Sequence, residues 1–191
     1  MEIMDMRLVI AAHYEPGAPR ITREIEELGI EEVFARIPES ERINIRETYN
    51  AISACGGELF IPEDSRWPAL LNDLEVPPVA IVIKGDAAVL QQQSLAIVGT
   101  RNPTPYGIKN AQEFAAGFVD REWAIISGGA YGIDSAAHKG ALIAEGVTIA
   151  VTASGLDSTY PAGNQRLFDE IIENGAIITE YMPGAIARPH R

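Results

Sequence analysis

The alternation of apolar runs with helix-like segments after residue 94 restricts the fold of this chain more than any other feature. Four apolar runs are bounded by small or polar residues, at 95–98, 123–126, 148–151 and 176–178. Three segments with helical spacing of apolar residues lie between them, at 106–120, 133–145 and 165–173. Strands that alternate with helices of this length predict right-handed crossovers and a parallel sheet. We therefore predict an α/β fold whose mostly parallel sheet carries helices on both faces.

The N-terminal part of the chain has a different pattern. Short helical patterns there end at punctuating residues, namely Gly29, Pro38 and the glycine pair at 56–57. The glycine pair is the best candidate for a boundary. We predict a small helical N-terminal domain at 1–56 and a larger sheet-containing domain at 57–191.

The charge of the chain is strongly acidic, with a formal net charge of −12 at pH 7. An acidic balance argues at first against a nucleic-acid ligand. Residues 1–93 hold 17 acidic and eight basic side chains, whereas residues 94–191 hold ten and seven. The acidity is concentrated in the N-terminal half, so a local basic pocket remains compatible with the C-terminal half.

Several classes of protein are disfavoured by what the sequence does not contain. No run of about 18 apolar residues is present, and the first residues do not follow the order of a signal peptide. Cys55 is the only cysteine, so it has no partner for an internal disulfide or a metal site. We interpret it as a structural thiol. We expect a cytoplasmic protein with no membrane span, no bound metal and no cofactor.

The most suggestive turn is the glycine-rich segment at 127–132, which follows an apolar run and precedes a helical pattern. Glycines let a backbone approach an anion, and a helix N-terminus favours negative charge. Ser127, Gly128 and Gly129 are therefore candidate phosphate-binding residues. The first glycine of a dinucleotide fingerprint is a serine here, and no ribose-binding acid follows the next strand, which disfavours an NAD dehydrogenase. A tight turn without a ligand is the alternative.

Three further polar residues are candidates at the same edge of the predicted sheet. Arg101 follows the first of the alternating strands and could hold a phosphate or form a surface salt bridge. Lys139 lies on the helix behind the glycine-rich turn and could reach the same ligand. Asn164 lies near a helix start, where it could cap the helix or contact a ligand.

A serine–histidine–aspartate triad can be imagined from Ser127, His138 and Asp134. No nucleophile-elbow spacing supports it, and we interpret Asp134 as a helix N-cap and His138 as a packing residue. No paired catalytic carboxylates are visible in the sequence. We therefore expect no catalytic residues.

These motifs resemble the DNA-processing protein A family (DprA, also called Smf). The matching segments are 96–101, 106–107, 127–134, 137–138, 140–142, 146–151, 155–157, 160–161, Asn164 and 179–181. Upstream, 64–68, Leu71, Pro78 and 84–86 also resemble the entry segment of the family. The resemblance covers residues 57–191. The family usually carries a Phe-Pro-x-Arg-Asn-Arg segment after the last match, whereas this chain ends at Pro189-His190-Arg191. We expect a piece that lacks the last strands of the sheet.

The resemblance implies an extended Rossmann-like domain that binds single-stranded DNA, protects incoming strands and helps to load RecA recombinase in natural transformation. It implies no catalytic turnover, and it leaves a homodimer open. Position by position, it implies that Arg101 and Lys139 contact phosphate, that Gly128 and Gly129 offer backbone amides, and that Asn164 adds a polar contact. Backbone-led binding of this kind depends strongly on salt and weakly on sequence.

A nucleotide-binding or nucleotide-hydrolysing enzyme is the alternative function. Phosphoribohydrolases, which cleave the base from a nucleoside monophosphate, are built on related glycine-rich sheets. They typically carry a Pro-Gly-Gly-x-Gly-Thr-x-x-Glu segment with a catalytic glutamate, and this chain has no such segment.

Overall fold

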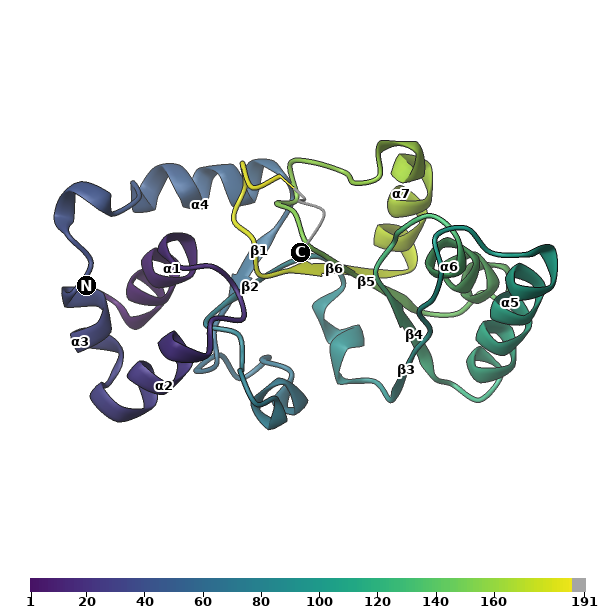
Figure 1. Ribbon diagram of the computed structural model, residues 1–191, viewed down its shortest axis with the longest axis horizontal. Coiled ribbons are helices and arrows are strands. Elements are labelled where there is room, and N and C mark those ends of the chain that lie inside the picture. Colours follow the sequence, from purple (N-terminus) through teal and green to yellow (C-terminus); the bar gives the residue numbers. More distant parts are fainter. Residues whose placement is uncertain (187–191) are drawn as a thin grey trace.

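A central sheet separates two groups of helices in this protein (Figure 1). The structure, a computed structural model, describes residues 1–186; the predictions for Pro189-His190-Arg191 lie outside the described residues. The helices of the described part are Ile3–His13 (α1), Pro19–Leu28 (α2), Ile30–Ala35 (α3), Ile45–Ala54 (α4), Pro105–Val119 (α5), Ile133–Ile143 (α6) and Gln165–Asn174 (α7). The strands are Glu58–Phe60 (β1), Ile81–Gly85 (β2), Ser94–Ala96 (β3), Ala124–Ser127 (β4), Thr148–Thr152 (β5) and Gly175–Thr179 (β6).

The six strands form one sheet in the order β1-β2-β6-β5-β4-β3. Strands β3 to β6 run parallel to one another, and β2 and β1 extend the sheet in antiparallel fashion beyond β6. This arrangement confirms the predicted α/β fold with a mostly parallel sheet. Because the four parallel strands point the same way, their carboxyl ends meet at one edge, where ligands bind in open α/β sheets.

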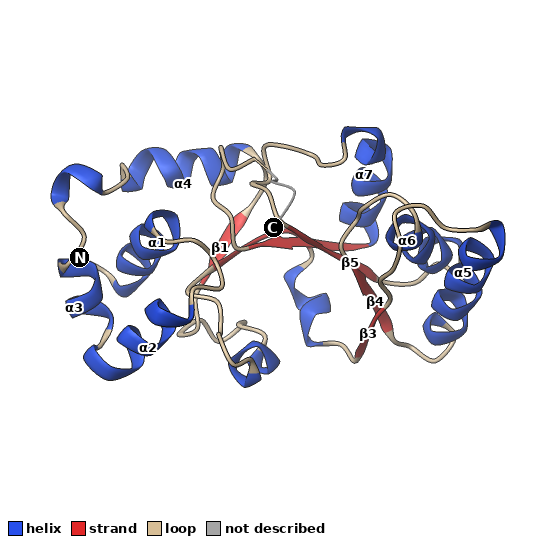
Figure 2. Ribbon diagram, viewed as in Figure 1, coloured by secondary structure: helices blue, strands red, loops and turns tan. Residues whose placement is uncertain are grey.

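The two faces of the sheet are covered differently. Ile125 and Ala137 share one buried cluster with α5 and α6, and Ala150 and Ile177 share another with α7. The opposite face carries the cluster around Phe60, which is closed by two short 3₁₀ segments, Ala69–Asp73 and Ala87–Gln91. Among the described residues, the long helices of the C-terminal half thus lie on one face, and only single 3₁₀ turns lie on the other (Figure 2). The predicted helices on both faces are therefore met by α-helices on one face alone.

The N-terminal helices form their own buried cluster and also share one with the sheet. Met6, Val9 and Ile10 of α1 pack among α2 and α3, whereas Leu8 packs against the β1–β2 end of the sheet. The guanidinium of Arg7 donates two hydrogen bonds of 2.7 Å to the Glu63 carboxylate. The predicted boundary at residue 56 lies between α4 and β1, and it stays a prediction because the two parts share packed side chains.

Candidate functional site

A cavity of about 440 Å³ lies where the loop after β3 meets the start of α6. Its lining includes Arg101, Ile108, Tyr131, Lys139 and Asn164, and we call it the cationic cavity. Its volume lies within the range of small-molecule sites. Three of the predicted site residues therefore share one hollow, although they are up to 63 positions apart in the chain.

Backbone contacts fix the loop that carries Arg101. The amide of Ile133, the first residue of α6, donates a 3.1 Å hydrogen bond to the carbonyl of Thr100. Gly132 has a φ of +92°, and a Cβ atom there would overlap the Thr100 carbonyl oxygen. Only glycine adopts this conformation without strain at such a close approach. The glycine at the end of the glycine-rich turn therefore holds the Arg101 loop against α6.

The cationic cavity concentrates positive charge on an acidic molecule. Arg101 and Lys139 are both exposed, and neither forms an ion pair with another described residue. No acidic side chain contributes to the lining within the part of the chain that the structure describes. Two unpaired cations in a hollow attract an anion such as phosphate, and an arginine can hold it through two parallel hydrogen bonds.

The first part of the glycine-rich turn, from Ser127 to Gly129, does not line this cavity, whereas Tyr131 and Gly132 do. The Ser127 hydroxyl is buried and donates to the carbonyl of Ile97 at 2.7 Å. Gly128 lies against the Asp134 carboxylate, because a Cβ atom there would be 2.8 Å from Asp134 Oδ2. Gly129 is buried where a Cβ atom would overlap the Phe168 ring. These close approaches explain the glycines by packing, so a direct contact of this turn with a ligand stays a prediction.

The interpretation of Asp134 as a helix N-cap is wrong. Gly132 occupies the N-cap position of α6, and Asp134 lies inside the first turn. The Asp134 carboxylate is buried and accepts a long hydrogen bond of 3.4 Å from the amide of Gly99. Its negative charge thus occupies the helix N-terminus at which the sequence predicted an external anion.

Asn164 lines the cationic cavity, but its side-chain NH₂ group donates its hydrogen bonds inside the protein. Its Nδ2 donates at 2.9 Å to the carbonyl of Gly129 and to the hydroxyl oxygen of Ser135. No side-chain capping bond from Asn164 to α7 is present. Because both protons are used, the amide offers an external ligand only its oxygen, which is an acceptor.

His138 packs below the site, as predicted. It is fully buried, and its Nδ1 lies 2.7 Å from the Thr148 hydroxyl oxygen. That hydroxyl donates to the carbonyl of Ile125, so His138 Nδ1 carries the proton. Nε2 makes no hydrogen bond with a described residue. Burial lowers the pKa of His138 to about 4, and the nearby Ser127 carbonyl offsets a little of that shift.

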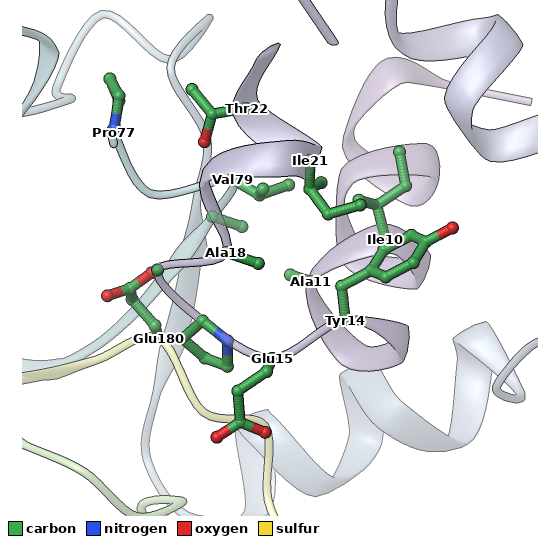
Figure 3. Close-up of a pocket in the computed structure, with 13 residues that line it drawn as sticks. Ile10, Ala11, Tyr14, Glu15, Ala18, Ile21, Thr22, Pro77, Val79 and Glu180 are labelled. Atoms are coloured by element: carbon green, nitrogen blue, oxygen red, sulfur yellow. The ribbon is translucent and has the colours of Figure 1, made fainter. Parts of the chain in front are cut away.

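A second hollow lies at the other end of the same sheet edge, between the α1–α2 loop and the turn after β6 (Figure 3). It combines an enclosed part of about 20 Å³ with a more open part of about 320 Å³, and both parts touch Tyr14, Glu15 and Glu180. We call it the Glu180 hollow. Burial raises the pKa of Glu180. No lysine or arginine among the described residues lines it, so it is unsuited to phosphate.

The described residues give little support to a metal site, a reactive thiol or a membrane span. Residues 1–186 contain no group of three or more His, Cys, Asp or Glu side chains placed to hold a metal ion. Burial, with a smaller contribution from Asp157, raises the pKa of the Cys55 thiol, which lowers its nucleophilicity at neutral pH. Within the same range, the helices are too short or too polar to cross a membrane.

The sequence comparisons agree with this arrangement. Residues 58–191 match the family described as DNA recombination-mediator protein A. The chain belongs to this family. It is 40% identical over 149 residues to a putative DNA processing protein DprA of Mycobacterium tuberculosis, which covers 71% of this chain and 38% of that protein. It is 30% identical over 192 residues to the protein Smf of Synechocystis, an alignment that covers 95% of this chain and 48% of that protein. The chain therefore spans less than half of the length of these relatives.

Solved structures of the family have the same fold. The X-ray structure of DNA processing protein A from Streptococcus pneumoniae aligns with all of this chain and 71% of that chain, with a TM-score of 0.77 and 25% identity. DNA processing protein A from Helicobacter pylori aligns with 70% of this chain and 60% of its own, with a TM-score of 0.61 and 30% identity. The second structure was described for its single-stranded DNA binding mode.

Several residues that line the cationic cavity were not singled out from the sequence, and Tyr131 is an aromatic one among them. Tyr131 lies inside the glycine-rich turn, lines the cavity and is 50% exposed. The available signal was an aromatic residue between two glycines, at 129 and 132, in a segment already suspected of binding a ligand. The glycines of this turn indicated a role for its backbone amides. The large side chain of Tyr131 was therefore not considered as part of the site.

Proposed function

We propose that this chain binds single-stranded DNA at the cationic cavity, with Arg101 and Lys139 holding backbone phosphates. The observation that carries the proposal is that Arg101 and Lys139 line one hollow, where no described residue pairs with them or adds an acidic side chain, although the chain as a whole is strongly acidic. The family relationship supports the same ligand. The work of such a site is binding, so we propose that the protein acts without catalytic turnover.

In its biological setting, we propose that the chain belongs to a cytoplasmic protein that protects incoming strands and helps to load RecA recombinase during natural transformation. The relatives named as DNA processing proteins support this setting. RecA and a second copy of the chain are the proposed protein partners. An affinity measurement with purified RecA, with and without a single strand, tests the first of them.

The DNA proposal is tested by binding a labelled single-stranded oligonucleotide to the wild type and to Arg101→Ala/Lys139→Ala. Loss of two charged hydrogen-bond donors should weaken binding at least about tenfold at low salt. It should also flatten the plot of log affinity against log salt by about 1.4, since each phosphate contact with a single strand contributes about 0.7.

The matched control is Arg20→Ala/Lys109→Ala, which removes the same two charges from exposed i,i+4 ion pairs outside the cavity. We expect that variant to bind within about twofold of the wild type, because neither side chain lines the cavity. It should also stay folded, because exposed pairs of this kind contribute little to stability. Equal losses in the two double variants would show a general charge effect and no site. A wild type that binds no strand at low salt would refute the proposal.

The alternative of a nucleotide-hydrolysing enzyme has weaker support. Base release needs an acid or base beside the glycosidic bond, and none of the described residues that line the cationic cavity is acidic. Incubation with nucleoside monophosphates, followed by chromatography for free base, distinguishes the two functions. Steady release that disappears on substitution of one carboxylate would favour the enzyme.

A further inference from the structure

The Glu180 hollow lies between the N-terminal helices and the sheet, and it takes no part in the proposed DNA site. Its walls come from α1, the loop after α1 and the start of α2 on one side, and from the loop before β2 and the turn after β6 on the other. Cavities between two structural units are common positions for small ligands. The open part, of about 320 Å³, has the volume of a small-molecule site.

Glu180 stands at the junction of the narrow and the open part of this hollow, because it lines both. Its half-buried carboxylate forms no ion pair or hydrogen bond with another described residue. Burial raises the pKa of Glu180, and no nearby positive charge offsets that shift. A carboxylate that is withdrawn from water without a partner is costly in its ionised form. The hollow therefore favours a ligand with a positive charge.

Glu15 also lines both parts of the hollow, but it differs from Glu180 in its surroundings. It is exposed, and its carboxylate accepts a hydrogen bond of 3.4 Å from the Tyr181 hydroxyl. Figure 3 shows the carboxylates of Glu15 and Glu180 pointing in different directions. A ligand in the narrow part therefore pairs with one carboxylate, that of Glu180, and not with both.

The size of the narrow part restricts which cation can pair with Glu180. Its volume of about 20 Å³ holds roughly one water-sized group. An ammonium group has that size, whereas a guanidinium or a quaternary ammonium group is larger. Calcium and magnesium ions prefer several oxygen ligands, and residues 1–186 contain no group of three or more metal-ligating side chains. The narrow part therefore fits a primary ammonium group.

The open part suits an aliphatic chain attached to that ammonium group. Most of its lining is aliphatic or proline, including Ile43, Met182 and Pro183. The described residues place no lysine or arginine in this lining, and His13 is already 3.8 Å from the Glu41 carboxylate. Methylene groups that leave the narrow part through this opening would exchange water for apolar side chains, which is favourable.

We propose that the Glu180 hollow binds the ammonium end of an aliphatic amine, with the ammonium group beside the Glu180 carboxylate in the narrow part and the carbon chain in the open part. A free diamine and a lysine side chain share this chemistry. The proposal goes beyond DNA binding, because the hollow shares no lining residue with the cationic cavity.

The experiment is a calorimetric titration of the whole chain with 1,5-diaminopentane. Glu180→Gln keeps the shape of the side chain but removes its charge, and it should weaken binding at least about tenfold, because a hydrogen bond between two charged groups is lost. The uncharged 1,5-pentanediol, which has the same chain length, should bind the wild type at least about tenfold more weakly than the diamine does. Tetramethylammonium, which is too large for the narrow part, should also bind more weakly.

Glu173→Gln is the matched control, since an acidic chain attracts any amine to some degree. It removes the same charge from an exposed position on α7, and it should bind the diamine within about twofold of the wild type. Backbone amide shifts measured by NMR should change at Ala18 and Thr22, which line the narrow part, and not at Lys139. A second titration, with Nα-acetyl-lysine methylamide, distinguishes a lysine side chain from a free amine, and tight binding of either supports the proposal.

The opposite outcomes are equally definite. If neither amine binds the wild type, the ammonium site is refuted. If Glu180→Gln and Glu173→Gln bind the diamine equally well, the attraction belongs to the acidic surface as a whole, and the site is again refuted. If tetramethylammonium binds as tightly as the diamine, the narrow part does not select the ligand. A single-stranded oligonucleotide should bind Glu180→Gln as it binds the wild type, so the failure of this site would leave the proposed DNA binding untouched.

Discussion

The cationic cavity and the Glu180 hollow occupy the same edge of one sheet and yet have opposite electrostatic character. The first follows β3, and the second follows β6, which runs parallel to β3 within the same sheet. One is lined by Arg101 and Lys139, the other by Glu15 and Glu180. The comparison teaches that the carboxyl edge of a parallel sheet supplies the place for a ligand, whereas the loops supply its chemistry.

The backbone differs between the two hollows in a way that a single substitution can reveal. At Gly132, beside Arg101, alanine would meet both a φ of +92° and the Thr100 carbonyl. We expect Gly132→Ala to lower the free energy of unfolding by about 3 kcal/mol or more, because conformational strain and overlap act together. It should also displace the Arg101 loop and weaken DNA binding. Urea unfolding and oligonucleotide titration measure the two effects.

Gly17→Ala is the matched control at the Glu180 hollow. Gly17 also has a positive φ, of +72°, but an added Cβ atom there meets no other atom within 4 Å. We therefore expect a loss of only about 1 kcal/mol and unchanged DNA binding. If the two alanine variants were equally stable, the contact between Gly132 and the Arg101 loop would not be a constraint.

Acid should destabilise the core below the cationic cavity through His138. Its pKa is about 4 in the folded protein and about 6.5 in the unfolded chain, so the unfolded state binds more protons between these values. Stability from this group is complete above pH 6.5 and is lost as the pH falls toward 4, by an amount on the order of 3 kcal/mol. Urea unfolding of the wild type and of His138→Asn at several pH values measures the difference.

The asparagine variant keeps a donor for Thr148 but does not titrate, so its stability should change less between pH 7 and pH 5 than that of the wild type. His13→Asn is the control, since His13 is more exposed than His138 and lies 3.8 Å from Glu41. That variant should retain the steep acid dependence. Parallel pH profiles for the wild type and His138→Asn would contradict the role of His138.

Ser127→Ala distinguishes a residue that builds the site from one that binds the ligand. The hydroxyl donates to the Ile97 carbonyl in a buried position, so its removal should lower the free energy of unfolding by about 1 kcal/mol. DNA affinity should stay within about twofold of the wild type. A clear loss of affinity without a loss of stability would instead support the sequence-based prediction that Ser127 contacts the strand.

The sequence predicted the C-terminal half better than the N-terminal half for a physical reason. Helices α5 and α7 each bury one stripe, so their spacing was visible. Helix α6 is buried without a break from 134 to 138, but the glycine-rich turn and Gly146 mark its two ends in the sequence. The observed ends of all three helices agree within about two residues of the predicted ones. Helix α1 was missed because the consecutive residues 6–10 are all buried, shared between two clusters, which leaves no amphipathic period to read.

The candidate site was predicted in position but not in detail. The prediction that polar residues gather after the strands brought together Arg101, Lys139 and Asn164. A sequence does not show which polar groups already form hydrogen bonds inside the fold. The Asp134 carboxylate and the Asn164 amide both do so. It also does not show that a residue such as Tyr131 turns outward, because that depends on the space left by Gly163.

The smallest expected effect concerns the Glu180 hollow, and it has the opposite sign to that of His138. Burial raises the pKa of Glu180, so the folded state holds this proton more tightly than the unfolded chain does. Stability from this group is therefore highest at acid pH and falls as the pH rises through the raised pKa. Glu180→Gln, which resembles the protonated form, should be slightly more stable than the wild type at pH 7.

That gain should disappear near pH 4, where Glu180 of the wild type is itself protonated, and it should be absent in Glu173→Gln, whose carboxylate is exposed on α7. DNA affinity should be unchanged in both variants, because the cationic cavity lies at the other end of the sheet edge. A Glu180→Gln variant that lost stability at pH 7 would show that the charged carboxylate is stabilised there. Glu180 and His138 would then both favour neutral pH over acid, and the opposite signs expected for the two groups would not hold.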